Sequence, residues 1–212
     1  MSRRAFSVVE ILIVLFIILL VASVFIPLNI ANVKQAGCIA KWKNTFAESK
    51  YSFQLLRAQN PSMFMPVMTN KQGDSASVFN VVKKYLNVDS EKSHPAYFAN
   101  YNYRYLNGRR IGKKSKFYVT NFATLESGVI IGFKLNKNNY IYENSPVGLM
   151  LFDINGLNEP NKMGKDIFGV NIYKNGIKPF GEGRSEGAMK ANCSPIGTGV
   201  LCSKYYLIGG KF

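Results

Sequence analysis

Residues 6–26 read FSVVEILIVLFIILLVASVFI, an apolar run in which Glu10 is the single charged residue. Arg3 and Arg4 stand just before the run and form a short basic leader. About 20 consecutive apolar residues are enough for a helix to cross a bilayer. A carboxylate in hydrocarbon is costly, and such groups within membrane helices are rare and functional. The run therefore predicts a membrane helix, and the presence of Glu10 indicates that this helix has a function in addition to anchoring.

Two ordinary kinds of segment compete with this interpretation. A cleaved secretory signal has an apolar stretch of roughly 7 to 15 residues followed by a small-residue cleavage site. The uncharged stretch from Ile11 to Val33 is too long for that class. A plain transmembrane anchor fits the length. It leaves Glu10 without a role, so the anchor is the weaker interpretation.

The segment from Arg3 to Leu12 resembles the class III signal of type IV pilins and type II secretion pseudopilins. The resemblance implies that prepilin peptidase cuts between Ala5 and Phe6 and that the new amino terminus is methylated. It also implies that Phe6 and Glu10 serve subunit assembly. Ala5 replaces the glycine most common before the cut, where small residues are tolerated. Lys and Arg residues flank the apolar run on both sides, so they do not decide how the helix is oriented in the membrane. The resemblance implies that the leader lies in the cytoplasm and the head on the other side of the membrane.

The helical pattern continues beyond the apolar run. We expect one helix over residues 6–60, with a transmembrane segment at 6–31 and an amphipathic half that ends before Pro61. Pro27 should kink this helix, and it follows Phe6 at an interval that pilins often show. Apolar or small residues recur with the spacing of one helix face at Ile39, Trp42, Phe46, Ser49, Phe53 and Leu56.

The rest of the chain, residues 61–212, predicts a β-rich head that begins with a short amphipathic helix over 76–86. Several short strands separated by Gly, Asn, Ser and Pro clusters indicate an antiparallel sheet. The expected class is α+β, a long amino-terminal helix packed on this sheet, which is the pilin-like architecture. The strand-like segments are 97–106, 116–122, 129–135, 140–142, 147–153 and 168–173.

One loop of the head carries ligands of the kind that calcium prefers. Residues 153–166 read DINGLNEPNKMGKD and are similar to a loop near the end of many pilin-like heads, where some pseudopilins bind calcium. Carboxylate and amide oxygens suit this hard cation. The same residue types are usual turn formers, whose side chains cap their own backbone without an ion. Calcium and a self-satisfied loop both stay open, and no other cofactor is expected. The candidate ligands are Asp153, Asn155, Asn161 and Asp166.

The formal net charge of +15 raises the question of an acidic partner such as nucleic acid. A basic cluster follows the turn-forming pair Asn107-Gly108, so it most simply decorates a hairpin tip. The tyrosines before it alternate and offer rings for base stacking, but alternation is also the ordinary strand pattern. Nucleic acid is therefore the less favoured partner. The cluster comprises Arg109, Arg110, Lys113, Lys114 and Lys116, and the tyrosines are Tyr97, Tyr101, Tyr103 and Tyr105.

Three cysteines complete the set of candidate residues. Cys193 and Cys202 bracket a loop with Gly and Pro that is short enough to close. In the oxidising periplasm that the resemblance implies they should pair, as many pilins do near the carboxy terminus, with free thiols as the alternative. Cys38 is left over on the long helix, where a small buried packing role is expected.

No motif for catalysis accompanies these features, so the protein is not expected to be an enzyme. His94 is the sole histidine, and neither a phosphate-binding loop nor a nucleophile elbow is present. The resemblance implies a structural subunit of a type IV pilus or a type II secretion pseudopilus, held in the inner membrane before assembly into a periplasmic or cell-surface filament. Its partners would be other pilin subunits, prepilin peptidase and the inner-membrane assembly platform. The alternatives are a DNA-binding or adhesive minor pilin with a basic head, and a membrane-anchored periplasmic binding module that does not polymerise.

Overall fold

The computed structural model describes residues 7–59, 75–93, 98, 101–136 and 145–211. The chain forms two compact units, residues 1–37 and residues 38–212. Several sequence predictions lie outside the described residues. These are the cut between Ala5 and Phe6, the strand over 140–142, and the positions of His94 and Tyr97.

Helix α1 runs from Val8 to Gln59 and contributes residues to both units. In the first unit, Val8–Ile26 has a mean hydropathy of 3.2, and its most apolar window has no residue buried within the chain. This stretch is long and apolar enough to cross a membrane, as the sequence predicts. The helical backbone continues through Pro27.

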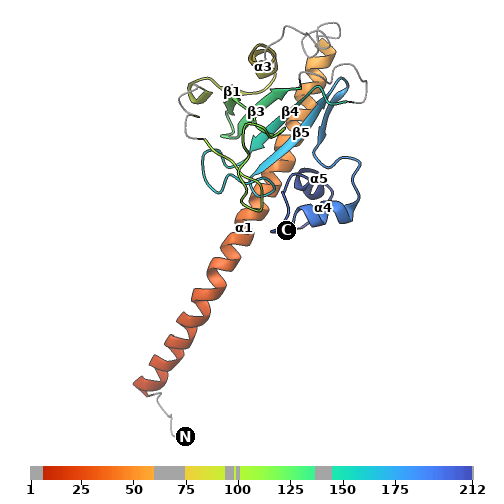
Figure 1. Ribbon diagram of the computed structural model, residues 1–212. Helices are drawn as coiled ribbons and strands as arrows, with labels where there is room; N and C mark the ends of the chain where they lie inside the picture. Colours follow the sequence, from red (N-terminus) through yellow and green to blue (C-terminus); the bar gives the residue numbers. More distant parts are fainter. Residues whose placement is uncertain (1–6, 60–74, 94–97, 99–100, 137–144, 212) are drawn as a thin grey trace. The chain divides into compact units, whose positions relative to one another are not determined.

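The second unit is built on a six-stranded antiparallel sheet whose strands follow the order of the chain (Figure 1). Each strand pairs with the next one in sequence, so that Phe152 lies opposite Phe168 in the central pair. The amino-terminal apolar helix, this sheet and the further helices confirm the α+β class. The strands are β1 (Val88–Asp89), β2 (Asn121–Leu125), β3 (Ile130–Leu135), β4 (Gly148–Asp153), β5 (Ile167–Tyr173) and β6 (Gly176–Pro179).

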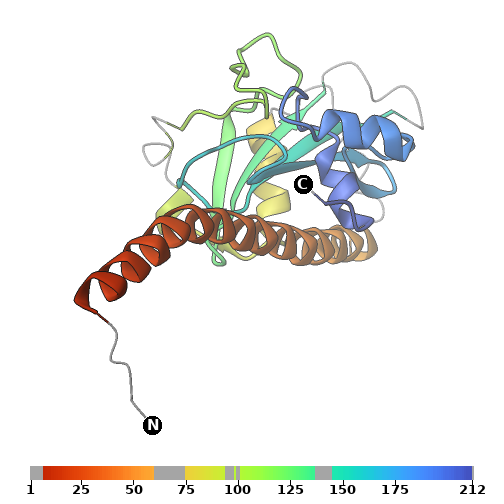
Figure 2. The ribbon, with the colours of Figure 1, turned by 90° about the horizontal axis from the view of Figure 1, so that it is seen from below.

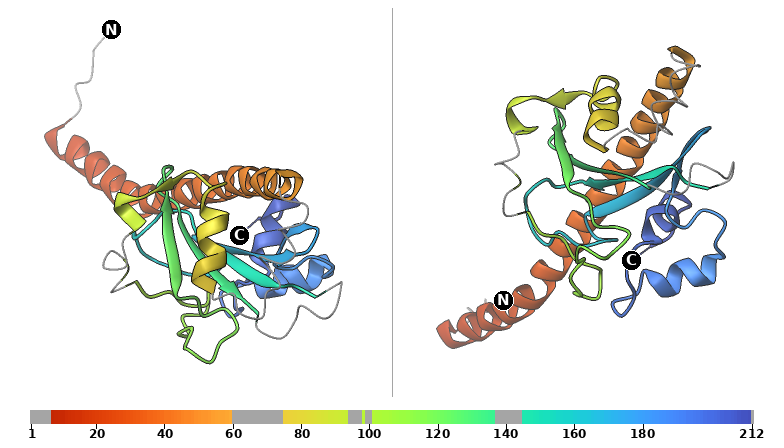
Figure 3. Two further views of the ribbon diagram at one scale, coloured as in Figure 1. Left: turned by 90° about the horizontal axis from the view of Figure 1, so that it is seen from above. Right: turned by 45° about the horizontal axis from the view of Figure 1, so that its top comes forward.

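Short helices surround the sheet. Helix α3 (Ser75–Lys83) overlaps the helix predicted over 76–86, beginning one residue earlier and ending three residues earlier, and packs against β2 and β3. Helices α4 (Glu186–Asn192) and α5 (Cys202–Leu207) lie side by side, and α5 packs against β5 (Figures 2 and 3). Ser185 caps α4 by accepting a hydrogen bond from the backbone N–H of Ala188, as residues at this position commonly do. A 3-10 turn, η1 (Glu91–Ser93), follows β1.

Both faces of the sheet are covered, which places two hydrophobic layers around it. Side chains alternate between the faces of a strand, and β4 is buried along its whole length. One layer joins the sheet to α1, α3 and α5, and the other joins it to the chain before β2. The first layer includes Trp42, Phe53, Leu56, Phe79, Phe133, Met150, Phe152, Phe168 and Tyr206. The second includes Tyr103, Ile111, Val119, Leu149, Leu151, Ile167 and Phe180.

Two predicted strands differ from the structure. Residues 101–106 form no strand, and two isolated bridges join Arg104 to Arg110 and to Lys162. The segment predicted over 116–122 becomes a strand only at Asn121. Side chains of both segments belong to the second hydrophobic layer, while the backbone of residues 101–106 and 116–120 stays outside the sheet. The alternation predicted a strand, and over residues 101–106 that prediction is wrong: Tyr103 is buried, but the segment does not pair as a strand.

Elements that the sequence analysis does not predict are all short. Strands β1 and β6 have two and four residues, and helices α4 and α5 have seven and six. A helix of this length makes about two turns. Periodicity therefore has too few positions in which to show itself.

Candidate functional site

Glu10 lies in the first turn of α1 and forms a reciprocal pair with Ser7. The backbone N–H of Ser7 donates to Glu10 Oε2 at 2.8 Å, and the backbone N–H of Glu10 donates to Ser7 Oγ at 3.2 Å. This is a capping box, in which a serine and a glutamate three residues later satisfy the free N–H groups at a helix start. Sequence reasoning missed it, although the Ser-x-x-Glu spacing was readable. Glu10 therefore has a local structural role in addition to any role between subunits.

The apolar stretch Val8–Ile26 around Glu10 leaves its side chains uncovered within its own chain. Val8, Phe16 and Leu19 keep 74%, 62% and 68% of their surface exposed, and their neighbours are similar. Exposing a large apolar side chain to water costs about 1.5 to 3 kcal/mol relative to burying it. A continuous surface of this kind requires lipid or another apolar surface against it.

The loop between β4 and β5 brings together the four side chains predicted as calcium ligands. Asp166 Oδ2 accepts hydrogen bonds from the backbone N–H of Asn161 at 2.8 Å and from Asn155 Nδ2 at 3.2 Å. Asp166 Oδ1 accepts from the backbone N–H of Lys162 at 2.6 Å. With its amide oriented to donate, Asn161 Nδ2 lies 3.0 Å from Asp153 Oδ2. These contacts match a loop that caps its own backbone.

Two backbone positions of this loop require their residue types. Asn161 has a φ of 49°, in the left-handed region that asparagine tolerates better than most residues. Gly156 has a φ of 71°, and a Cβ atom there would lie 2.9 Å from the carbonyl oxygen of Gly128. The Asn and Gly residues of the motif thus serve the turn directly.

Asp153 and Asp166 are almost fully buried, with 2% and 1% of their surface exposed. Burial raises the pKa of Asp153 well above its usual value; the hydrogen bond from the Tyr101 hydroxyl opposes this rise, and the Asp166 carboxylate adds to it. Burial also raises the pKa of Asp166, opposed by the backbone N–H groups of Lys162 and Asn161.

The loop holds more buried acceptors than donors. Asp153 Oδ1 and Asn155 Oδ1 have no hydrogen-bond partner among the described residues. A proton on Asp153 would supply a donor to this cluster, and a cation would also meet the surplus of oxygens. Within the described ranges, no three His, Cys, Asp or Glu side chains are placed to hold a metal. A bound calcium ion would therefore need amide and backbone oxygens as ligands in addition to the carboxylates. Calcium binding stays a prediction.

We expect the stability advantage of the wild type over an Asp153→Asn variant to shrink as the pH rises from about 4 toward neutrality. The folded chain holds the Asp153 proton more tightly than the unfolded chain, so stability is present below the unfolded pKa and is lost as the pH rises through the folded pKa. Melting curves of both chains in calcium-free buffer measure this difference. A difference that grows with pH would contradict it. A bound calcium ion would instead raise the wild-type melting temperature most at high pH.

The basic cluster follows a tight turn at Asn107-Gly108, where the sequence predicts one. Gly108 has a φ of 84°, and its N–H donates to the carbonyl oxygen of Tyr105 at 2.9 Å. The turn lies against the disulfide loop, because the N–H groups of Leu106 and Asn107 donate to the carbonyl oxygens of Thr198 and Gly197. All five cations of the cluster are exposed, and none forms an ion pair within the described part of the chain.

Cys193 and Cys202 form the predicted disulfide, with their Cα atoms 5.4 Å apart. The bond joins the end of α4 to the start of α5 and closes the loop that supports the basic turn. Cys38 carries a free thiol and is partly buried on α1. Burial raises its pKa, and the Asp166 carboxylate adds to this effect. A raised pKa lowers the fraction of reactive thiolate, which fits a packing role better than a reactive one.

An aromatic cavity of about 520 Å³ lies on the second unit between α3, η1 and the segments that flank β2. Its lining contains tyrosines that the sequence analysis weighed as base-stacking residues, but it assigned no cavity to them. The rings come from parts of the chain that are distant in sequence, so no local motif indicates the cavity. The aromatic lining residues are Phe79, Phe98, Tyr101, Tyr103, Tyr118 and Phe122.

Comparisons with protein-family models, with curated proteins and with solved structures find no match for this chain. Functional inference therefore rests on the residues themselves.

Proposed function

We propose that the protein is a subunit of a pilin-type filament, assembled through the amino-terminal part of α1 into a type IV pilus or a type II secretion pseudopilus. The observation that carries this proposal is a carboxylate at the first turn of a helix whose apolar side chains over Val8–Ile26 are uncovered within the chain. An anchor needs only the apolar side chains. The capping box gives this carboxylate a local role, and in the proposal it also makes a polar contact within an apolar assembly.

In the proposed mechanism, the leader is removed after Ala5 and Phe6 becomes the amino terminus. The apolar helices of many subunits then pack against one another in the filament core. Glu10 of one subunit pairs with the amino group of Phe6 in the next, and each charge compensates for the burial of the other. Pro27 gives the helix a position where one backbone hydrogen bond is already missing, so the helix can stretch there. The head is a contact surface in this proposal and performs no catalysis.

Before assembly, the same helix would hold the subunit in the inner membrane with its head in the periplasm. Prepilin peptidase and the inner-membrane assembly platform would be its partners at this stage. The Cys193–Cys202 disulfide supports the oxidising location, because such bonds persist in secreted and periplasmic proteins.

A second candidate function is a minor subunit whose basic turn binds a polyanion such as DNA. Residues 92–125 contain no Asp or Glu, and they include Arg104 and the whole basic cluster. Cations without neighbouring carboxylates keep their full attraction for phosphate groups. This candidate concerns the head alone, so it is compatible with filament assembly.

The mass of the mature amino-terminal peptide tests the main proposal. In cells that contain prepilin peptidase, we expect the chain to begin at Phe6 with one added methyl group on its amine. Material produced without the peptidase should retain Met1 and serves as the control. Retention of Met1 in the presence of the peptidase, or a cut further along near Ala22, would exclude a pilin-type precursor.

A further inference from the structure

Hydrogen bonds to the protein interior hold two of the tyrosines that line the aromatic cavity. The hydroxyl of Tyr101 donates to Asp153 Oδ2 at 2.5 Å, and the hydroxyl of Tyr103 donates to the carbonyl oxygen of Phe117 at 3.0 Å. Tyr103 Oη also accepts from the backbone N–H of Val119 at 2.7 Å. Both hydroxyls are therefore occupied inside the protein, and these tyrosines contribute ring surface to the cavity. Walls fixed in advance lower the entropy cost of binding.

The rings meet one another at steep angles. Tyr101 and Tyr103 stand at 77° and 80° to Phe122, with ring centroids 5.2 Å and 6.4 Å away. Phe98 lies at 35° to the same ring with centroids 5.4 Å apart. Rings in direct contact leave no flat slot between them for a planar base. Angled walls instead present ring faces to a ligand with a non-planar, C–H-rich surface.

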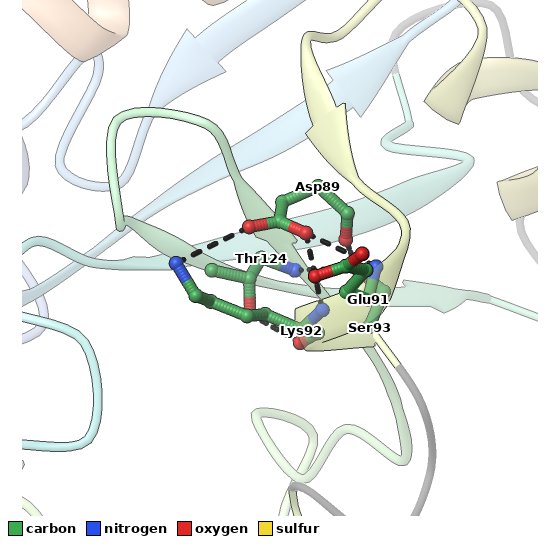
Figure 4. Close-up of polar contacts among 5 residues, drawn as sticks. All are labelled: Asp89, Glu91, Lys92, Ser93 and Thr124. Atoms are coloured by element: carbon green, nitrogen blue, oxygen red, sulfur yellow. Dashed lines mark hydrogen bonds and ion pairs between the residues drawn. The ribbon is translucent and has the colours of Figure 1, made fainter.

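The rim near Ser93 is also held in place, as Figure 4 shows. Asp89 Oδ1 accepts hydrogen bonds from the backbone N–H groups of Glu91 and Lys92. Ser93 Oγ donates to the carbonyl oxygen of Asp89 and accepts from the backbone N–H of Thr124, which lies on β2. The hydroxyl of Thr124 donates in turn to the carbonyl oxygen of Lys92. This network ties η1 to the sheet and fixes one side of the cavity.

The other described lining residues are mostly polar, and none of them carries a carboxylate. Among the described lining residues, Lys83 is the one charged group; its ammonium lies 5.2 Å from the centroid of the Phe79 ring and forms no ion pair in the described part of the chain. A cation beside amides and hydroxyls favours a ligand that carries a negative charge and many oxygens. The polar lining residues are Asn80, Lys83, Ser93, Asn102, Thr120 and Asn121.

From this combination we infer that the cavity binds a saccharide, and specifically one that bears a carboxylate. The C–H faces of the sugar ring would lie on the angled aromatic walls. Its hydroxyls would bond to side-chain amides such as those of Asn80 and Asn121 and to the Thr120 hydroxyl, and its carboxylate would face Lys83. A pocket that mixes ring surface with a few placed polar groups is the usual form of a specific small-molecule site. The described lining of this site includes no residue of α1, so the test of sugar binding does not depend on filament formation.

Titration of the full-length protein with digalacturonate and with a neutral galactose disaccharide tests the inference. The protein should be held in a detergent without a sugar headgroup, because a glycosidic detergent would compete. By calorimetry, we expect the wild type to bind digalacturonate with a Kd of about 1 mM or tighter. The neutral disaccharide should bind more weakly, because it lacks the charge that faces Lys83.

Variants locate the site. Lys83→Gln should weaken digalacturonate binding about fivefold or more, with little effect on the neutral sugar. Lys84→Gln is the matched control, since Lys84 is the next residue, is exposed and lies outside the lining; binding should stay at the wild-type level. Tyr118→Ala should weaken both sugars by removing a wall. Melting curves check that each variant is folded. If Tyr118→Ala does not fold, the comparison of Lys83→Gln with Lys84→Gln still tests the inference.

Several results would overturn the inference. One is no detectable binding of either sugar at about 10 mM. Another is binding that is unchanged in Lys83→Gln, or that weakens equally in Lys84→Gln, which would indicate general attraction to a basic protein. Tighter binding of a nucleoside monophosphate than of either sugar would assign the cavity to nucleotides instead.

Discussion

Glu10→Gln should reduce incorporation of the subunit into filaments about tenfold or more while leaving leader cleavage intact. In the proposed assembly the Glu10 carboxylate pairs with the amino group of Phe6 in a neighbouring subunit. The amide of glutamine carries no charge, so the amino group would be left unpaired among apolar helices. Breaking a buried ion pair by removing one partner costs about 3 to 5 kcal/mol. Quantification of the subunit in sheared or purified filaments, relative to its cellular amount, measures the effect.

The capping box makes this substitution more informative than replacement by alanine. Glutamine can still reach back to the backbone N–H of Ser7, because Glu and Gln both complete a capping box. Glu10→Gln therefore removes the charge and retains the cap, whereas Glu10→Ala removes both. Ser7→Ala is the complementary control: it retains the charge and removes the serine cap, at a cost of about 0.5 to 2 kcal/mol. Loss of incorporation in Ser7→Ala with normal incorporation of Glu10→Gln would assign Glu10 to helix capping alone.

Trp42→Ala should destabilise the second unit by about 3 to 5 kcal/mol, the range for deleting a buried tryptophan or phenylalanine side chain. Trp42 is fully buried and joins α1 to the sheet and to α5. Its ring stacks on Phe168 with centroids 5.1 Å apart, and its indole N–H donates to the carbonyl oxygen of Ser203 at 2.9 Å. For a domain of this size we expect a melting temperature lower by about 10 °C.

Far-UV circular dichroism is the suitable measurement, because Trp42 is the only tryptophan in the chain and its removal also removes the fluorescence reporter. Trp42→Phe should lose less stability, since it keeps a ring in the core but leaves the carbonyl oxygen of Ser203 without its donor, a cost of about 1 to 3 kcal/mol. Tyr51→Ala is the matched control on the same helix, where the side chain is 62% exposed. A melting temperature for Trp42→Ala equal to that of Tyr51→Ala would refute the central role of Trp42.

The long helix and the central strands follow from the sequence because their signals are local and repeated. The three-four spacing that includes Trp42, Phe53 and Leu56 places those residues in the core, where the structure has them. Strands β3, β4 and β5 match three of the predicted segments within a residue or so. Each of these elements repeats its pattern over enough residues for the pattern to be distinct from chance.

The candidate sites were recoverable only in part. The Asx-rich loop is visible in the sequence because its residue types are turn formers close together along the chain. Its partner Tyr101 is not visible, since that hydrogen bond joins residues 52 positions apart. The aromatic cavity was missed for the same reason: its walls come from α3, η1 and the segments around β2, and each contributes only a few side chains.

The sequence by itself determined the apolar helix, the Asn107-Gly108 turn, the central strands and the α+β class, because these depend on the order of residue types over short stretches. Only the tertiary structure decided which tyrosines turn inward, how Asp153 and Asp166 share one buried loop, and where the cavity opens. Those outcomes depend on contacts between distant segments, such as the bond from Trp42 to Ser203 across 161 positions. Contacts of this kind form only when the whole chain packs, since burial of one segment is set by the surfaces that the others supply.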